Sequence, residues 1–308
     1  MSLMLSPVVT AAERFEAFSW EVGDMPMVKL HTFRGTIQVE RSAPGRVSLI
    51  VHANEGNNET PDDWLKAIDV NGAAFGAGVS VSIKRSDWGV DIGVGDAPIR
   101  ELAITLRVPP QCSLDLETDL GGIDVGNDIT GHMRARVRDG DIFFGRVDGS
   151  VSAKSVRGSV TVSRTAGDLN VNCGFGEITV GTVLGNASLA TKSGSIEFMK
   201  VQGSVLAEAE NGNVTAQFSS DLQQPASLVA DGGSVMMSID EGTAFALKAR
   251  ASWGRVRSRY AFDEVLRGGD GKRRLEGVSN GGGVNLDVRS SGGDVVIKTM
   301  PKLENDWF

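Results

Sequence analysis

Six basic side chains near the C-terminal end are the residues whose type and spacing most clearly suggest chemistry. Between Lys248 and Arg274 the sequence has nine Lys or Arg residues against three Asp or Glu residues, although the whole chain carries a net charge of -8. Such a concentration favours contact with an anionic polymer, for example an envelope polysaccharide. The alternative is a solvated basic face that balances acidic neighbours. The candidate anion-binding residues are Arg255, Arg257, Arg259, Lys272, Arg273 and Arg274.

The acidic side chains and histidines show no pattern typical of catalysis. A polysaccharide lyase or hydrolase would gather its acids or its base on one outward face. The acids expected to point outward are Asp141, Asp168, Glu177 and Glu197. Asp168 belongs to a different strand series from the others, so we expect it on another side, whereas Glu177 and Glu197 could lie within one coil step of each other. Surface solubility explains the set better. The histidines, which lie far apart without ligand spacing, are His31, His52 and His132. No phosphate-binding loop or nucleophile elbow occurs. We therefore predict no catalytic residue, metal ligand or cofactor.

The two cysteines, Cys112 and Cys173, have neither metal-ligand spacing nor the density of a disulfide framework. A single bridge between them is disfavoured. Cys173 is expected in an inward column between Ser155 and Thr191, which indicates a small buried thiol.

The elements that must position these residues follow from a glycine period of nine. Two series of glycines, each with an 18-residue step, interleave along the middle of the chain. The first series is Gly140, Gly158, Gly176, Gly194 and Gly212, and the second is Gly131, Gly149, Gly167, Gly185 and Gly203. After each glycine, apolar residues alternate with polar ones, which predicts a strand with one buried face. Glycine suits the corner between strands because it accepts positive φ.

Two such strands make one 18-residue coil. Stacked coils, about 4.8 Å apart, would pair each strand in parallel with its copy in the next coil. Equivalent apolar residues would then form internal ladders, such as Ile142, Val160, Ile178, Ile196 and Val214. The sequence thus predicts an all-β fold, a parallel β-solenoid of about 18-residue two-strand coils, with the right-handed connection usual for parallel strands.

Two other nine-residue architectures are disfavoured by their side-chain columns. A calcium β-roll needs stacked acids at its corners, but the residues before each glycine form no acidic column. They are Asp148, Arg157, Ala166, Phe175, Leu184, Ser193, Gln202 and Asn211. A flat ice-binding array needs an unbroken threonine column, whereas Glu197 interrupts that of Thr161, Thr179 and Thr215.

The period also divides the chain. We expect a flexible leader at 1–13, an N-terminal β region at 14–118 and the repeat solenoid at 119–298, followed by a C-terminal cap or tail at 299–308. One short helix at about 61–69 is predicted within the second segment, because Thr60 can cap it and Pro61 suits its first turn. After Gly212 the step lengthens to 21 residues, and final strands follow Gly282 and Gly293. The N-terminus lacks the basic region of a complete signal peptide.

Repeated units such as "SVRGSVTV" and "TKSGSIEF", together with "LRVPPQCSLDLETDLGGIDVGNDITGHMRA", resemble the bacterial putative-adhesin family of β-strand-repeat domains of unknown function. The resemblance covers roughly residues 14–298. It implies a β-solenoid and an envelope-associated role, and it brings no catalytic residues to transfer. The 21-residue coils and the stretch 259–281 depart from its strict period.

The function predicted from these observations is a non-catalytic scaffold of the cell envelope or surface, an adhesin-like binding module. The alternative is a carbohydrate-active enzyme, a polysaccharide lyase or hydrolase on the same scaffold. Polysaccharide or another envelope or surface protein would be the partner, and self-association through open solenoid ends is a further prediction. The negative charge argues against general nucleic-acid binding. The sequence has no run of 18 apolar residues, so we predict no transmembrane helix. We expect an extracytoplasmic location, periplasm or cell surface, with the cytoplasm as the alternative.

Overall fold

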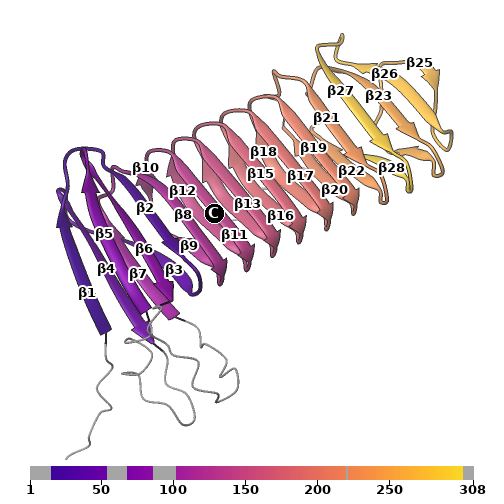
Figure 1. Ribbon diagram of the computed structural model, residues 1–308. Coiled ribbons are helices and arrows are strands. Elements are labelled where there is room, and N and C mark those ends of the chain that lie inside the picture. Colours follow the sequence, from indigo (N-terminus) through magenta and orange to yellow (C-terminus); the bar gives the residue numbers. More distant parts are fainter. Residues whose placement is uncertain (1–14, 54–67, 86–101, 220, 301–308) are drawn as a thin grey trace, which may run out of the picture.

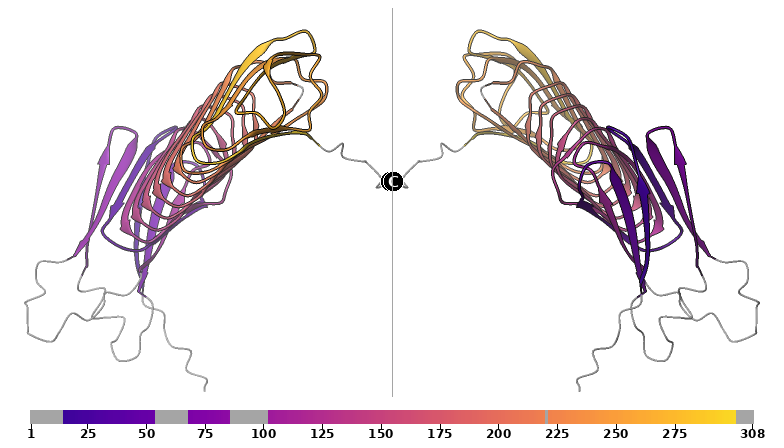
Figure 2. Two further views of the ribbon diagram at one scale, coloured as in Figure 1. Left: turned by 90° about the vertical axis from the view of Figure 1, so that its right-hand side faces the viewer. Right: turned by 90° about the vertical axis from the view of Figure 1, so that its left-hand side faces the viewer.

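The computed structural model describes residues 15–53, 68–85, 102–219 and 221–300, which form a β-solenoid of two facing sheets (Figure 1). Each sheet has 14 strands in this described part, and no helix occurs there. Seen along its length, the molecule is a flattened tube whose successive coils superpose (Figure 2). The apolar core fills the space between the sheets along the whole stack.

The first sheet, sheet A, contains β1 (Phe15–Glu21), β3 (Thr36–Arg41), β4 (Arg46–Ala53), β7 (Leu102–Val108), β9 (Ile123–Val125), β10 (Ile129–Thr130), β12 (Ile142–Asp148), β14 (Val160–Thr165), β16 (Ile178–Val183), β18 (Ile196–Val201), β20 (Val214–Phe218), β22 (Val235–Ile239), β24 (Val256–Ser258) and β28 (Val295–Thr299). The second sheet, sheet B, contains β2 (Met27–Thr32), β5 (Ile68–Phe75), β6 (Gly78–Arg85), β8 (Ser113–Leu120), β11 (Met133–Asp139), β13 (Val151–Arg157), β15 (Leu169–Phe175), β17 (Ala187–Ser193), β19 (Val205–Asn211), β21 (Ala226–Ala230), β23 (Phe245–Ala251), β25 (Glu264–Gly268), β26 (Arg274–Ser279) and β27 (Val284–Ser290).

The 18-residue coil predicted from the glycine period is confirmed. β14 pairs with β16 in parallel, and Val160 stands opposite Ile178 in that register. Both side chains are fully buried, whereas Thr179 beside Ile178 is exposed. The alternation of apolar and polar residues therefore separates the core from the outer face, as a strand with one buried face requires.

The corner glycines are required by conformation and by space at once. Gly158 has φ +134°, a region that side chains with a Cβ rarely adopt. A Cβ built there would lie 2.0 Å from the carbonyl oxygen of Gly140 in the preceding coil. The backbones of successive coils thus approach too closely at this corner for any other residue.

An inward polar column satisfies the carbonyls of the same corner. Ser155, Cys173 and Thr191 each donate a hydrogen bond to the carbonyl oxygen of the corner glycine fifteen residues earlier, at 3.3, 3.1 and 3.2 Å. All three side chains are buried. Cys173 therefore lies in the inward column predicted for it, where its thiol takes the place of a hydroxyl.

The order of coils in space differs from their order in the sequence at both ends. β27 lies between β21 and β23, and β28 lies between β22 and β24. The strands that follow Gly282 and Gly293 are therefore not the last of the stack. At the other end, β2 lies between β6 and β8. A repeat period fixes which residues face inward, but it does not specify which coil a strand joins.

Antiparallel strands cover the N-terminal end of both sheets and the C-terminal end of sheet B. At the N-terminal end β4 pairs with β7, β1 with β4, and β5 with β6. At the C-terminal end the hairpin of β25 and β26 adds to β23 (Figure 1). Such coverage satisfies edges that would otherwise attract other strands.

Three predicted segments fall wholly or partly outside the described residues. Of the helix expected at about 61–69, residues 61–67 lie outside them. Ile68 and Asp69 are not helical: they begin β5, where Ile68 pairs with Arg85 of β6. The expected leader at 1–13 and residues 301–308 of the expected tail also lie outside the described part.

Candidate binding surfaces

The predicted anion-binding residues lie at the C-terminal end of the stack, on two sides of it. Arg255, Arg257 and Arg259 are exposed along β24, the terminal strand of sheet A. The backbone of Lys272 lies beside this strand, because its carbonyl oxygen accepts a hydrogen bond of 2.7 Å from the Val256 N–H. Four of the six residues are therefore neighbours along one strand edge.

Part of this charge is already engaged within the protein. The Arg257 Nε lies 3.0 Å from the Asp294 Oδ2, and the Arg255 Nη1 donates to the Gly271 carbonyl oxygen at 3.3 Å. The carboxylate of Asp270 accepts a hydrogen bond from the Ser258 N–H. These contacts hold the loop 269–272 against β24, so this side of the predicted patch serves partly to close the end of sheet A. The nearby Trp253 is 83% exposed at the corner.

The other side of the end contains two arginines that sequence reasoning did not single out. Arg274 opens β26 and stands opposite Arg250 of β23, which in turn stands opposite Arg289 of β27. Arg250 could have been recognised from its position between the buried Ala249 and Ala251. Arg289 could not have been recognised in this way, because it lies next to Arg250 only through the insertion of β27 between β21 and β23.

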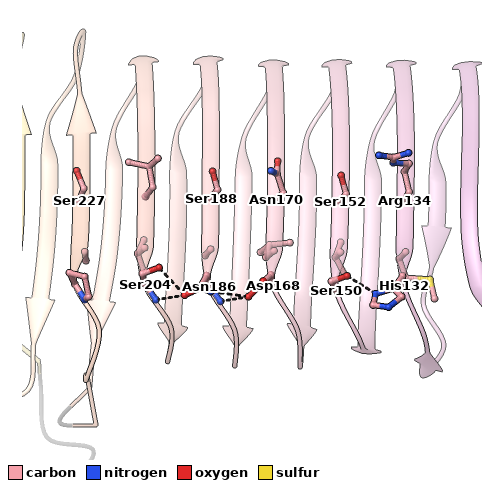
Figure 3. Close-up of a pocket in the computed structure, with 18 of the residues that line it drawn as sticks. His132, Arg134, Ser150, Ser152, Asp168, Asn170, Asn186, Ser188, Ser204 and Ser227 are labelled. Atoms are coloured by element: carbon pink, nitrogen blue, oxygen red, sulfur yellow. Dashed lines mark hydrogen bonds between the residues drawn. The ribbon is translucent and has the colours of Figure 1, made fainter.

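A shallow groove of about 1010 Å³ crosses the outer face of sheet B, and no sequence signal identified it. It extends over neighbouring strands from β2 to β27. Two rows of side chains line its middle (Figure 3). The corner row comprises His132, Ser150, Asp168, Asn186 and Ser204. The outer row comprises Arg134, Ser152, Asn170, Ser188, Leu206 and Ser227.

The corner row is bonded to itself and to the backbone. The Asn186 N–H and side-chain amide both donate to the Asp168 Oδ1, at 2.8 and 3.1 Å. The Ser204 N–H and hydroxyl both donate to the Asn186 Oδ1, at 2.9 and 2.8 Å. His132 Nδ1 lies 2.7 Å from the Ser150 hydroxyl (Figure 3). Asp168 is therefore a structural cap for the next coil rather than a free surface acid.

The outer row keeps its hydrogen-bonding capacity for solvent or a ligand. Its members stand directly opposite one another on consecutive parallel strands. In the part of the chain that the structure describes, no side-chain hydrogen bond engages Ser152, Asn170, Ser188 or Ser227. Leu206, which is 42% exposed, adds an apolar surface between the last two. The result is a line of unused hydroxyl and amide groups at a fixed spacing of about 4.8 Å.

A family model matches residues 79–298, more than two thirds of the chain. The chain belongs to the Toastrack DUF4097 family. This domain of unknown function covers most of the strands that line the groove and all of the C-terminal basic residues. The resemblance predicted from the repeats is thereby confirmed, as is the β-solenoid fold.

Solved structures similar to this Toastrack chain include a protein named "putative adhesin" from Bacteroides fragilis, with 14% identity, a TM-score of 0.41 and coverage of 94% of this chain and 98% of that one. Another protein so named, from Parabacteroides distasonis, has 8% identity, a TM-score of 0.35 and the same coverages. No curated protein matches the chain. Among the described residues of this Toastrack protein, no helix is long and apolar enough to span a membrane.

One cluster of acids borders the groove of this Toastrack protein. The Arg136 Nη1 lies 3.5 Å from the Asp115 Oδ1 and 3.4 Å from the Glu117 Oε2, and His31 lies 4.0 Å from Glu117. The arginine occupies the space between the two carboxylates, where a glycosidic bond would have to lie. Asp168 is three strand spacings from Asp115, about 14 Å, which exceeds the about 6.5–9.5 Å of paired catalytic acids.

The two cysteine thiols of the Toastrack chain belong to its core. Cys112 and Cys173 are both free and buried. Burial raises the pKa of the Cys112 thiol to about 12 and also raises that of Cys173, so both remain protonated at neutral pH. No group of three or more potential metal-binding side chains occurs among the described residues.

Proposed function

We propose that the protein is a non-catalytic scaffold of the bacterial envelope or surface that binds an extended polysaccharide along the groove of sheet B. The observation that carries the proposal is the outer row, whose Ser and Asn side chains stand in register on consecutive strands and make no side-chain hydrogen bond within the described residues. Sugar hydroxyls both donate and accept hydrogen bonds, as do these groups.

The rigidity of the scaffold supports this function. Each outer-row residue is held on a strand that is paired on both sides, so its position changes little on binding. Preorganisation of this kind lowers the entropic cost of binding a long chain. The exposed Leu206 gives a surface on which the apolar face of a sugar ring can pack. An extended segment of another surface protein is the alternative occupant.

The acid geometry supports a non-catalytic role over the enzyme alternative. Asp168 caps the following coil, and Asp115 shares Arg136 with Glu117. Both acids of the groove are thus engaged by neighbouring groups of the protein. The proposal includes an extracytoplasmic location, because long polysaccharides are components of bacterial envelopes.

A blocking substitution in the groove tests the proposal. Ser188→Trp places an indole in the middle of the outer row and should abolish binding of neutral oligosaccharides in calorimetry or on a glycan array. The matched control is Thr179→Trp, an exposed position of the neighbouring β16 on sheet A, which should bind as the wild type does. If the Ser188 variant retains the wild-type affinity for every glycan bound, the groove is not the binding site.

The enzyme alternative has its own assay. Purified protein incubated with a panel of envelope and plant polysaccharides should release neither reducing ends nor the unsaturated products of a lyase. Measurable release that disappears in an Asp115→Asn, Glu117→Gln double variant would favour the enzyme.

A further inference from the structure

We infer that Arg250 and Arg274, on sheet B at the C-terminal end of the groove, form an anion subsite for the carboxylate or sulfate groups of an acidic polysaccharide. The inference rests on the proposed function, because it assigns a charge preference to the ligand of the same face. It differs from the patch predicted on sheet A, where much of the charge is held by the protein itself.

The register of three neighbouring strands brings the arginines together. Arg250 of β23 is directly opposite Arg274 of β26 on one side and Arg289 of β27 on the other. Arg250 alternates with the buried Ala249 and Ala251, so its side chain projects from the outer face. Like charges that face each other across strands oppose folding, and an anion between them relieves that repulsion.

The arginines differ in whether they already have a partner. The guanidinium of Arg289 makes two contacts with Asp287, at 2.9 and 2.7 Å. In the described part of the chain, no ion pair or side-chain hydrogen bond engages Arg250 or Arg274. Two adjacent guanidinium groups therefore remain available, and their planar arrays of donors match carboxylate and sulfate oxygens.

The neighbouring row of side chains leaves the cluster positive. Lys248 stands opposite Glu276 on one side and Asp287 on the other, and Glu276 also faces Arg267 of β25. Three acids, Glu264, Glu276 and Asp287, stand against a larger set of bases on these four strands. The bases are Lys248, Arg250, Arg267, Arg274 and Arg289.

The cluster continues the groove rather than lying apart from it. Asp287, which lines the groove, stands opposite Ser227 of the outer row and is two residues from Arg289 on the same face. A chain that follows the outer row past Ser227 therefore reaches β27 and then the Arg250–Arg274 pair on β23 and β26. These strands lie together at the C-terminal end of the molecule (Figure 1).

Calorimetric titrations of the full-length protein test the subsite with three probes: an oligogalacturonate, a sulfated dextran oligomer and a neutral oligosaccharide of equal length. We expect the Arg250→Gln, Arg274→Gln double variant to bind the anionic probes at least about tenfold more weakly and the neutral one unchanged. Loss for one anionic probe alone identifies the preferred group. Glutamine preserves most of the side-chain length, and circular dichroism with a thermal melt verifies folding.

The control is a second pair of arginines with the same cross-strand arrangement. Arg146 and Arg164 stand opposite each other on β12 and β14 of sheet A, so their double substitution removes the same charge from the other face. An equal loss in this control would attribute binding to net charge, and unchanged affinity of the Arg250, Arg274 variant would also overturn the subsite. If Ser188→Trp leaves the affinity for all three probes unchanged, the proposed function of the groove is wrong. That result is distinct from a failure of the Arg250–Arg274 subsite alone.

Discussion

Gly158 shows how one residue type sets the spacing of the whole array. Substitution by alanine would add a Cβ 2.0 Å from the Gly140 carbonyl oxygen, at a φ of +134°. Backbone cannot move aside as a flexible side chain can, so the two coils must separate locally. We expect Gly158→Ala to lower the free energy of unfolding by at least about 2 kcal/mol, measured by chemical denaturation.

The matched control separates the clash from the backbone conformation. Gly269 has a similar φ of +141°, but a Cβ there meets nothing within 4 Å. Gly269→Ala should therefore cost only the strain of positive φ and destabilise clearly less than the substitution at Gly158. Equal losses would show that the close approach of coils contributes nothing.

The buried thiol of Cys112 should make stability depend on alkaline pH. Burial raises its pKa from an ordinary 9.0 to about 12, so above pH 9.0 the unfolded chain releases a proton that the folded chain keeps. Stability is therefore complete below pH 9.0 and falls as pH rises toward 12, by at most about 1.4 kcal/mol per pH unit from this group. Urea unfolding of wild type and Cys112→Ala across this range should show a shallower decline in the variant. Parallel declines would contradict the assignment.

At the scale of the elements, the corner row joins each coil of sheet B to the next. The Asn186 side chain accepts two hydrogen bonds from Ser204 and donates one to Asp168. The substitution Asn186→Ala removes these three hydrogen bonds and should lower the free energy of unfolding by about 1–2 kcal/mol. The control is Asn170, one strand before Asn186, whose side chain makes no hydrogen bond in the part of the chain that the structure describes. Its substitution by alanine should change stability by less than about 0.5 kcal/mol. Equal effects would mean that the corner bonds are replaced by water at no cost.

The strands also show which features could be predicted from the sequence and which could not. The alternation around Val160 and Ile178 sufficed to predict strands, their inward faces and their parallel pairing, because burial and period are local properties. The insertion of β27 beside β23 was not predictable, since several coils offer it an equivalent apolar face. Arg289 was missed for that reason. The groove was missed because it arises from unused short side chains, such as Ser152 and Ser188, on many strands at once.

At the scale of the whole molecule, each coil contacts little beyond its two neighbours, so stability is close to a sum over adjacent coils. This property predicts that a complete coil can be removed from the middle. Deletion of residues 159–176 removes β14 and β15 and joins Gly158 to Glu177, leaving every remaining strand in phase. β12 would then pair with β16, and β13 with β17. The variant should stay folded and be shorter by one strand spacing, about 4.8 Å, in small-angle scattering.

A truncation after Gly283 should do more harm although it lies nearer the end of the chain. It removes β27 and β28, which in space lie inside the stack between the coil of β21 and β22 and that of β23 and β24. Four parallel pairings are lost at once, and the terminal hairpin of β25 and β26 stays attached only to β23 and, through its loop 269–272, to β24. We expect a lower melting temperature and rapid proteolysis within residues 240–283, while the internal deletion resists the same protease. A truncated protein as resistant as the deletion variant would mean that the terminal coil can close the gap by itself, and that coil order at this end is set by kinetics rather than by the pairings seen here.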